Sequence, residues 1–87
     1  MNKKQQLMEC FDVAMRYYQQ FMAVKIKTPN KKTEVIIFKR DNFDSKRDYY
    51  NNFYDENLRL KRNKKVQIVE FCCSNNLEEI EIELFND

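Results

Sequence analysis

Residues 24–40 read "VKIKTPNKKTEVIIFKR", two stretches of strand-like sequence on either side of a turn. Apolar and charged residues alternate in "VKIKT", residues 24–28, as they do in a strand with one buried face. Pro29 and Asn30 favour a turn, and the β-branched run "TEVIIFKR", residues 33–40, is typical of a second strand. We therefore predict a β-hairpin from about residue 24 to residue 39.

The segment before this hairpin has a helical period. Over residues 3–22 the apolar side chains recur every three or four positions and share one face of a helical wheel, with polar side chains opposite. Asn2 is a suitable N-cap, and Asp12 with Arg16 has the spacing of an ion pair on the polar face. We expect a helix over residues 3–22 whose apolar face packs on the core or, less simply, forms a partner-binding groove or a dimer seam. That face comprises Leu7, Phe11, Ala14, Met15, Tyr18, Phe21 and Met22.

Residues 44–56 predict a second helix, with Asp44 or Ser45 as its N-cap and Asn57 ending it in the left-handed conformation. Its four aromatic residues are followed closely by basic ones, the combination used by platforms for single-stranded nucleic acid. On a helical wheel, however, the rings share one broad face and the opposite face is polar. We therefore expect the rings of Tyr49, Tyr50, Phe53 and Tyr54 to pack on the core.

The rest of the chain predicts strands. Residues 58–61, "LRLK", form a short alternating segment, and "VQIVEFCC", residues 66–73, suits a strand buried on both faces in the middle of a sheet. In "EIEIELF", residues 79–85, apolar residues alternate with glutamates, which predicts a half-buried strand. The expected fold is α+β: a single domain over residues 1–87, with one antiparallel sheet and helices packed on one of its faces.

The composition excludes several classes of site. The chain contains no glycine, so Walker and dinucleotide-binding loops are absent, and no histidine, so Ser-His and Cys-His nucleophiles are absent too. We expect a protein that is not an enzyme and holds no metal or other cofactor. Without glycine, asparagine is the residue best suited to positive φ at turns and helix ends. The candidates are Asn30, Asn57, Asn63, Asn75 and Asn76.

Three cysteines, an odd number, argue against a disulfide framework and favour a reducing, cytoplasmic compartment. Cys72 and Cys73 are adjacent, so in a strand they would point to opposite faces. No apolar run approaches the length of a membrane span, which is about 20 residues. We expect no membrane partner.

The net charge of +2 conceals a strong asymmetry along the chain. Residues 1–65 hold all the basic residues, whereas residues 66–87 hold none and are acidic. Basic residues cluster at two expected turns, which would form one positive end if both hairpins point the same way. Such an end can bind phosphates non-specifically, although lysines also protect edge strands from aggregation. The residues concerned are Lys31, Lys32, Arg59, Lys61, Arg62, Lys64 and Lys65.

The acidic segment offers a second candidate surface. On the expected strand, Glu79, Glu81 and Glu83 share one face at a spacing of about 7 Å, close to that of successive phosphates, with Glu78 beside them. Such a row of carboxylates could occupy a groove built for nucleic acid. The alternative is pairing with a neighbouring strand that carries Lys25 and Lys27.

Phe, Tyr, Met, Ile, Asn and Lys make up about half of the chain, and "YYNNFYDENLRLK" spans residues 49–61. In this composition, in its size and in that segment, the chain resembles small accessory proteins of phages and mobile elements of low-GC Gram-positive bacteria, including anti-CRISPR proteins. The resemblance implies a cytoplasmic inhibitor, in an infected or element-carrying bacterium, of a host defence nuclease or its guide-RNA complex.

Three functions remain open from the sequence. The leading hypothesis is inhibition of a CRISPR effector nuclease, with the acidic segment as the nucleic-acid mimic and the basic turns contacting guide RNA. The second is a small regulator that contacts nucleic acid directly through its basic turns. The third is a dimerisation module built on the first helix, so the protein is expected to be a monomer or a homodimer.

Overall fold

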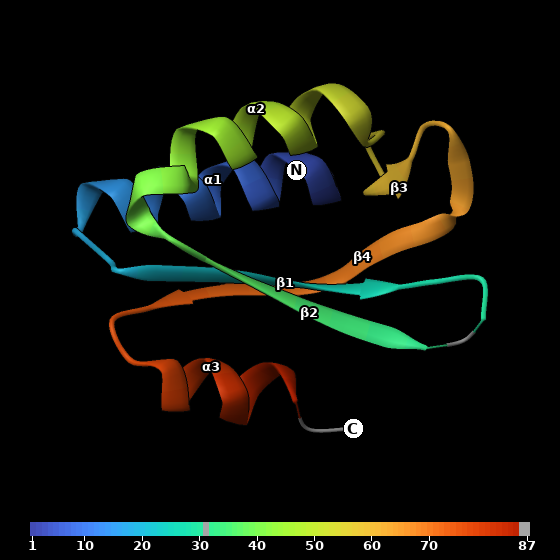
Figure 1. Ribbon diagram of the computed structural model, residues 1–87. Coiled ribbons are helices and arrows are strands. Elements are labelled where there is room, and N and C mark those ends of the chain that lie inside the picture. Colours follow the sequence, from blue (N-terminus) through green and yellow to red (C-terminus); the bar gives the residue numbers. More distant parts are fainter. Residues whose placement is uncertain (31, 86–87) are drawn as a thin grey trace.

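The computed structural model describes residues 1–30 and 32–85 (Figure 1). Within these residues, four antiparallel strands form one sheet in the order β2-β1-β4-β3, and three α-helices pack on it. The elements in chain order are α1 (Lys3–Arg16), β1 (Phe21–Lys27), β2 (Thr33–Lys39), the 3₁₀ turn η1 (Arg40–Asn42), α2 (Phe43–Phe53), β3 (Arg59–Leu60), β4 (Asn63–Ser74) and α3 (Leu77–Leu84).

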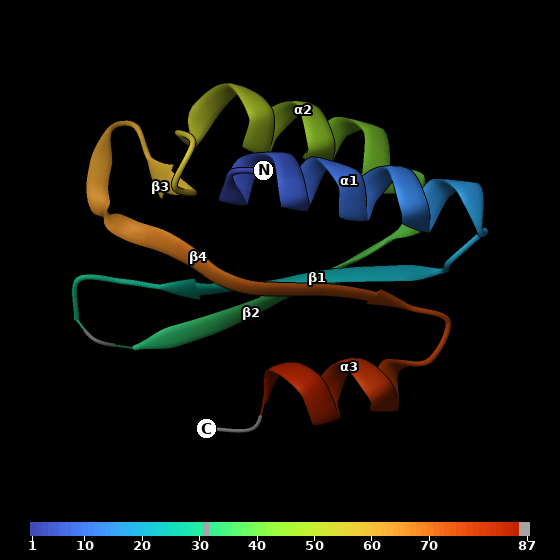
Figure 2. The same cartoon turned by 180° about the vertical axis from the view of Figure 1, so that it is seen from behind.

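The helices lie in two layers with the sheet between them. α1 and α2 run side by side over one face, and α3 lies alone on the other face, beneath β1 and β4 (Figures 1 and 2). The α+β class and the order helix, hairpin, helix are confirmed. The two helices expected from the sequence do share one face, whereas the second face is covered by a helix that we had expected to be a strand.

That C-terminal segment is the main correction. Residues 79–85 do not form a strand, because Leu77–Leu84 is helical, capped by Asn76, whose side chain accepts a hydrogen bond from the Glu78 N–H at 2.8 Å. Ile80 and Leu84, one helical turn apart, are buried, but Ile82 is 65% exposed. The alternation of glutamate and isoleucine imitates a strand, yet glutamate and leucine favour helices and only the i,i+4 pair meets the core.

α1 ends six residues before the predicted limit of residue 22. Asn2 and Gln5 form a capping box at its start, as the predicted N-cap required. At its end Tyr18 adopts a φ of 56°, while the N–H of Gln19 bonds to the Ala14 carbonyl. This is a Schellman motif. Phe21 and Met22 therefore belong to β1, where they pair with both neighbouring strands.

The predicted hairpin is confirmed. β1 and β2 pair from Phe21↔Lys39 to Lys27↔Thr33 without irregularity. β1 is buried throughout its centre because β2 and β4 flank it and helices cover both of its faces. β4 is the other inner strand, as its apolar sequence predicted, with a register shift opposite Lys25 and Ile26.

Two clusters of buried side chains hold the layers together. The larger lies between the sheet and the helices α1 and α2, where the rings of Phe11 and Phe38 contact each other and both contact Phe43 and Tyr50, at centroid distances of 5.7 to 6.3 Å. The smaller consists of Ala23, Ile80 and Leu84, beneath α3. The sheet is thus buried on both faces, but mainly on one.

The turns are made differently from our expectation. Within the described residues the positions with positive φ are Tyr18 and Leu58, not asparagines. Asn57 does not end α2, which stops at Phe53, and the predicted caps Asp44 and Ser45 lie inside the helix. Asparagine instead contributes side-chain oxygens that accept backbone N–H groups, as at Asn2, Asn63, Asn75 and Asn76.

Candidate nucleic-acid interface

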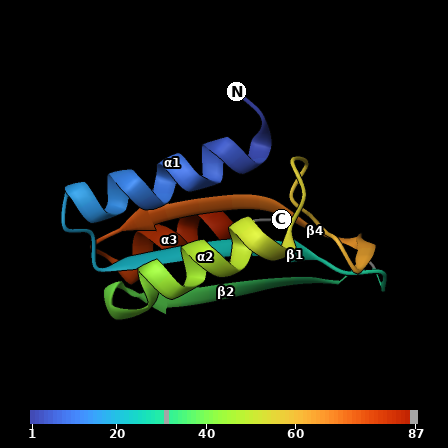
Figure 3. The ribbon, with the colours of Figure 1, turned by 90° about the horizontal axis from the view of Figure 1, so that it is seen from above.

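Both basic turns lie at the same end of the sheet (Figures 1 and 3). Lys27, at the end of β1, pairs with Gln67 of β4, and Gln67 also pairs with Arg59 of β3. The turn after β1 and the turn between β3 and β4 are therefore neighbours, as the hypothesis of one positive end required. We call this surface the basic end; its described members, all exposed, are Lys27, Lys32, Arg59, Lys61, Arg62, Lys64 and Lys65. Lys31 lies outside the described residues.

A single carboxylate organises the segment that carries five of these cations. Asp55 Oδ1 accepts the backbone N–H groups of Asn57 and Arg59 at 2.9 and 3.0 Å, and its Oδ2 accepts Lys64 Nζ at 2.6 Å. These bonds close the loop in which Leu58 takes its positive φ and is buried. The sequence analysis did not identify Asp55, although aspartate side chains in turns often accept the backbone N–H group two residues further along the chain.

The electrostatics of Asp55 follow from this geometry. Burial acts to raise the pKa of its carboxyl, but the hydrogen bonds from Lys64 and from the N–H groups of Arg59 and Asn57 outweigh that effect and lower the pKa to about 2. Asp55 is therefore ionised across the neutral range. Among the described residues, Lys64 is the member of the basic end that forms an ion pair, so the other six cations face solvent.

The glutamates of α3 do not form the row that a strand would have given them. On α3, Glu79 accepts a hydrogen bond from the Ser74 hydroxyl at 2.5 Å. Burial raises the pKa of the Cys72 thiol, and the neighbouring Glu83 carboxylate raises it further. Both therefore face β4, whereas Glu81 lies about 200° from Glu79 on the wheel. The phosphate-like spacing that we expected of Glu79, Glu81 and Glu83 was wrong because it depended on a strand. Glu78 and Glu81 lie on the remaining faces of the helix.

The aromatic residues of α2 divide into two pairs. Tyr50 and Tyr54 are buried as expected, and burial raises the pKa of both hydroxyls. Tyr49 and Phe53 are 42% and 46% exposed, with ring centroids 5.1 Å apart. They share a flank of α2 with Lys46, and the end of the helix that carries Phe53 contacts the basic end, because the Phe53 carbonyl accepts the Lys61 N–H at 2.9 Å. The expectation that all four rings pack on the core was therefore half right.

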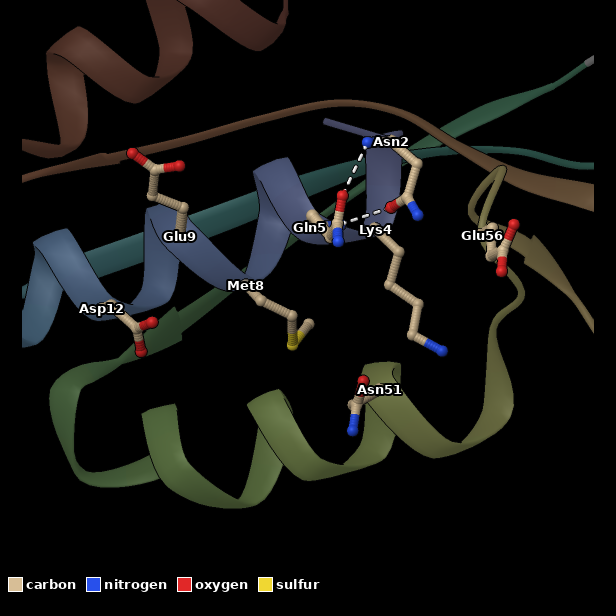
Figure 4. Close-up of a pocket in the computed structure, with 8 residues that line it drawn as sticks. All are labelled: Asn2, Lys4, Gln5, Met8, Glu9, Asp12, Asn51 and Glu56. Carbon is tan, nitrogen blue, oxygen red and sulfur yellow. Dashed lines mark hydrogen bonds between the residues drawn. The ribbon is translucent and has the colours of Figure 1, made fainter.

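A groove of about 460 Å³ lies between α1 and α2 (Figure 4). In Figure 4 the capping-box bonds between Asn2 and Gln5 lie at the first turn of α1, with Lys4 and Glu56 nearby. On its wall Asp12 forms an ion pair with Arg47 of α2 rather than with Arg16, the partner predicted from spacing. The lining side chains include no hydroxyl, thiol or imidazole. The groove between the two helices therefore offers no nucleophile of these types. Its lining comprises Asn2, Lys4, Gln5, Met8, Glu9, Asp12, Asn51 and Glu56.

The cysteines are packing residues. Cys73 lies against the larger core and Cys72 against the smaller one, so the two point to opposite faces as expected. Burial is the main cause that raises the pKa of each, to about 12 for Cys72. Burial also raises the pKa of Cys10, which is hydrogen bonded to Cys73. Thiols that resist ionisation are poor nucleophiles.

No protein-family model, curated protein or solved structure matches the chain. Within the described residues there is no helix long and apolar enough to span a membrane. Over the same part of the chain, no group of three or more histidine, cysteine, aspartate or glutamate side chains is arranged to hold a metal ion.

Proposed function

We propose that this protein is a non-enzymatic nucleic-acid-binding protein that contacts the phosphate backbone through its basic end. The observation that carries the proposal is the meeting of the two basic turns at one end of the sheet, where Lys27 and Arg59 both neighbour Gln67 (Figure 1). A cluster of exposed cations is the electrostatic footprint of phosphate binding.

The rigidity of the basic end supports this proposal. Asp55 fixes the loop beside β3, and the β1–β2 turn is tied by bonds from the Thr28 N–H and hydroxyl to the Lys32 carbonyl. Cations held on a fixed scaffold lose less conformational entropy on binding than cations on a mobile tail. Since phosphates carry no sequence information, binding through this surface is expected to be weakly specific.

A pair of matched variants tests the proposal. Lys61→Gln with Arg62→Gln removes a lysine and an arginine from the basic end, and Lys3→Gln with Arg16→Gln removes one of each from exposed positions on α1. Binding to a labelled oligonucleotide is measured by fluorescence anisotropy, in single-stranded and duplex forms, as salt rises from about 50 mM. We expect the first variant to bind at least about tenfold more weakly, with a salt slope reduced by about 1.5–2, and the second to stay within about twofold of the wild type.

Equal losses in both variants would mean that only net charge matters, and an absence of binding by the wild type at about 50 mM salt would dispose of the proposal.

A second candidate is inhibition of a host nuclease, such as a CRISPR effector, through α3. The observation that favours it is the mixed surface of this helix, where Ile82 and Phe85 are 65% and 55% exposed beside Glu78 and Glu81. Exposed apolar side chains ringed by charges are typical of protein interaction sites. In this alternative α3 docks on a basic protein surface without imitating a phosphate row, and the basic end contacts the guide RNA.

The test for this candidate is nuclease cleavage of target DNA in the presence of the protein. Glu78→Gln with Glu81→Gln should abolish inhibition, whereas Glu79→Gln, which keeps an acceptor for Ser74, should not. Inhibition that survives the double change but is lost in the Lys61 and Arg62 variant would assign the activity to the basic end instead.

A further inference from the structure

The edges of the sheet differ in how they are protected. β3 is two residues long and closes one edge of the sheet. β2 closes the other with seven residues, Thr33–Lys39, that contain no proline and pair with β1 without a bulge. Natural proteins usually blunt such an edge with a bulge, a proline, a short strand or charged side chains. β2 has no bulge and no proline, its charges Glu34 and Lys39 lie toward its ends, and its centre carries Val35, Ile36 and Ile37.

The backbone groups that β2 directs outward can be assigned. The Thr28 N–H bonds to the Lys32 carbonyl, and the Arg40 N–H bonds to the Gln20 carbonyl, at either end of the hairpin. Hydrogen-bonded pairs alternate along an antiparallel ladder, so the even-numbered residues of β2 bond to β1. The odd-numbered residues therefore direct their N–H and C=O groups outward. Within the described residues no strand or side chain bonds to them.

α2 does not cover the whole length of β2 on the helix-facing side of the sheet. Along the helix-facing side of β2, burial increases from Glu34, which is exposed, through Ile36 to Phe38, which is 4% exposed. α2 begins directly after the Phe38 end, and at its other end the Phe53 carbonyl accepts the Lys61 N–H from the β3 segment across the sheet. The helix thus crosses the sheet diagonally and leaves the Glu34 half of β2 uncovered (Figure 3).

We propose that two copies of this chain associate through β2, edge to edge and antiparallel, about a two-fold axis at Ile36. This register uses all seven residues of the strand. It pairs Val35 with Ile37 and Thr33 with Lys39 of the second copy, and these are the residues whose backbone groups point outward. Each such pair exchanges two hydrogen bonds. Since like copies share one patch, the interface is isologous and closed.

Charge complementarity favours a second copy of this chain as the partner that pairs with β2. In this register Glu34 lies opposite Phe38 of the second copy, on the helix-facing side. Lys46 Nζ sits 5.9 Å from the centroid of the Phe38 ring in the same chain. The Glu34 carboxylate is therefore brought to Lys46 of the second copy, and the two-fold axis repeats the pair. No like charges are directly opposed within Thr33–Lys39. The next pair in this register is Lys32 opposite Arg40, whose guanidinium is hydrogen bonded to the carbonyls of Ala14, Gln19 and Met15 in its own chain.

Apolar side chains on the other face of β2 fit the same register. α3 packs mainly on β1 and β4; on β2, Val35 is half-buried against the cluster of Ala23, Ile80 and Leu84, whereas Ile37 is 38% exposed. In the dimer, Ile37 of each copy lies opposite Val35 of the other. On the helix-facing side, the Ile36 side chains of the two copies lie opposite each other. The two basic ends then lie at opposite ends of one continuous sheet, so both stay accessible. The dimer does not depend on the proposed nucleic-acid binding.

Charge reversal and its restoration test this interface in the 87-residue chain by sedimentation equilibrium. We expect a monomer–dimer equilibrium. Glu34→Lys should raise its dissociation constant at least about tenfold, because it sets a lysine against Lys46 of the second copy at both symmetry-related positions. Combining it with Lys46→Glu should return the dissociation constant to within about threefold of the wild type. Glu9→Lys changes the net charge equally on exposed α1 and should have no effect.

Hydrogen exchange of the wild type gives a test that needs no variant. The amide N–H groups of Val35 and Ile37 should become protected as protein concentration rises, while that of Ile36 should be protected throughout. A monomer at every concentration, unchanged exchange at Val35 and Ile37, or a dimer weakened by Glu9→Lys and not by Glu34→Lys would each overturn the proposal.

Discussion

Beneath α1 and α2, four aromatic rings from three elements pack against one another, whereas beneath α3 the buried apolar cluster is Ala23, Ile80 and Leu84. Buried apolar area scales with stabilisation, at about 25 cal/mol per Å². The first face therefore holds the domain together, and the second attaches one short helix. The difference suggests that α3 can respond to a partner or to a mutation without loss of the sheet.

The largest expected effect is on the first face. Phe11→Ala removes the ring that contacts Phe38, Phe43 and Tyr50, and we expect the free energy of unfolding to fall by about 3–5 kcal/mol. Urea unfolding followed by circular dichroism measures it. A loss below about 1 kcal/mol would show that the aromatic cluster is not the main core.

A change on the second face should have a more local consequence. Leu84→Ala removes a side chain that is 1% exposed, and we expect a loss of about 2–3 kcal/mol in the stability of α3. Amide exchange should accelerate over Leu77–Leu84 while β1 and β4 keep most of their protection. Equal acceleration in the sheet would mean that the two faces unfold as one unit.

The loop at the basic end is expected to contribute less than either core. Asp55→Ala removes three hydrogen bonds and should cost about 1–2 kcal/mol, whereas Asp55→Asn, which can keep the two backbone bonds, should cost less. Urea unfolding of both variants measures the difference. Identical losses would show that the bond from Lys64 carries the whole effect.

The same carboxylate predicts a dependence on pH. The pKa of Asp55 is about 2 in the folded protein and 3.8 without the fold, so its stabilisation is complete above 3.8 and is lost as the pH falls toward 2. The difference in unfolding free energy between the wild type and Asp55→Asn should shrink across that window. A constant difference from pH 5 to 2, roughly, would contradict the assignment.

The smallest expected effect concerns the cap of α3. Asn76→Ala removes the acceptor of the Glu78 N–H and should destabilise the helix by about 0.5–1 kcal/mol, whereas Asn76→Asp should preserve it. The exchange rates of the α3 amides measure both. Equal exchange rates in the two variants would show that the side chain at position 76 does not stabilise α3 as a cap.

The sequence predicts some of these features better than others. The hairpin, the start of α1 and the inner position of β4 were readable because each has a long or strongly patterned run. Residues 79–85 were misassigned because glutamates alternate with isoleucine or leucine over residues 79–84, which satisfies a strand period. The helix is decided by Asn76 and by contacts of Ile80 and Leu84 with a distant strand.

The candidate surfaces depend still more on topology. Each basic turn can be read from the sequence, but their meeting at one end follows from the order β2-β1-β4-β3, which no local pattern specifies. The open edge of β2 follows from the same order. Asp55 could be noticed from its position before a turn, yet its bond to Lys64 depends on how the β3–β4 hairpin folds back.

The most direct test of the central claim, that the basic end is the functional surface, is an NMR titration of the isotopically labelled protein with a single-stranded oligonucleotide at low salt. The account predicts amide shift changes at Lys27, at Lys32 and over residues 59–65, with little change in α3. Changes confined to Leu77–Leu84, or no changes at about 50 mM salt, would contradict it.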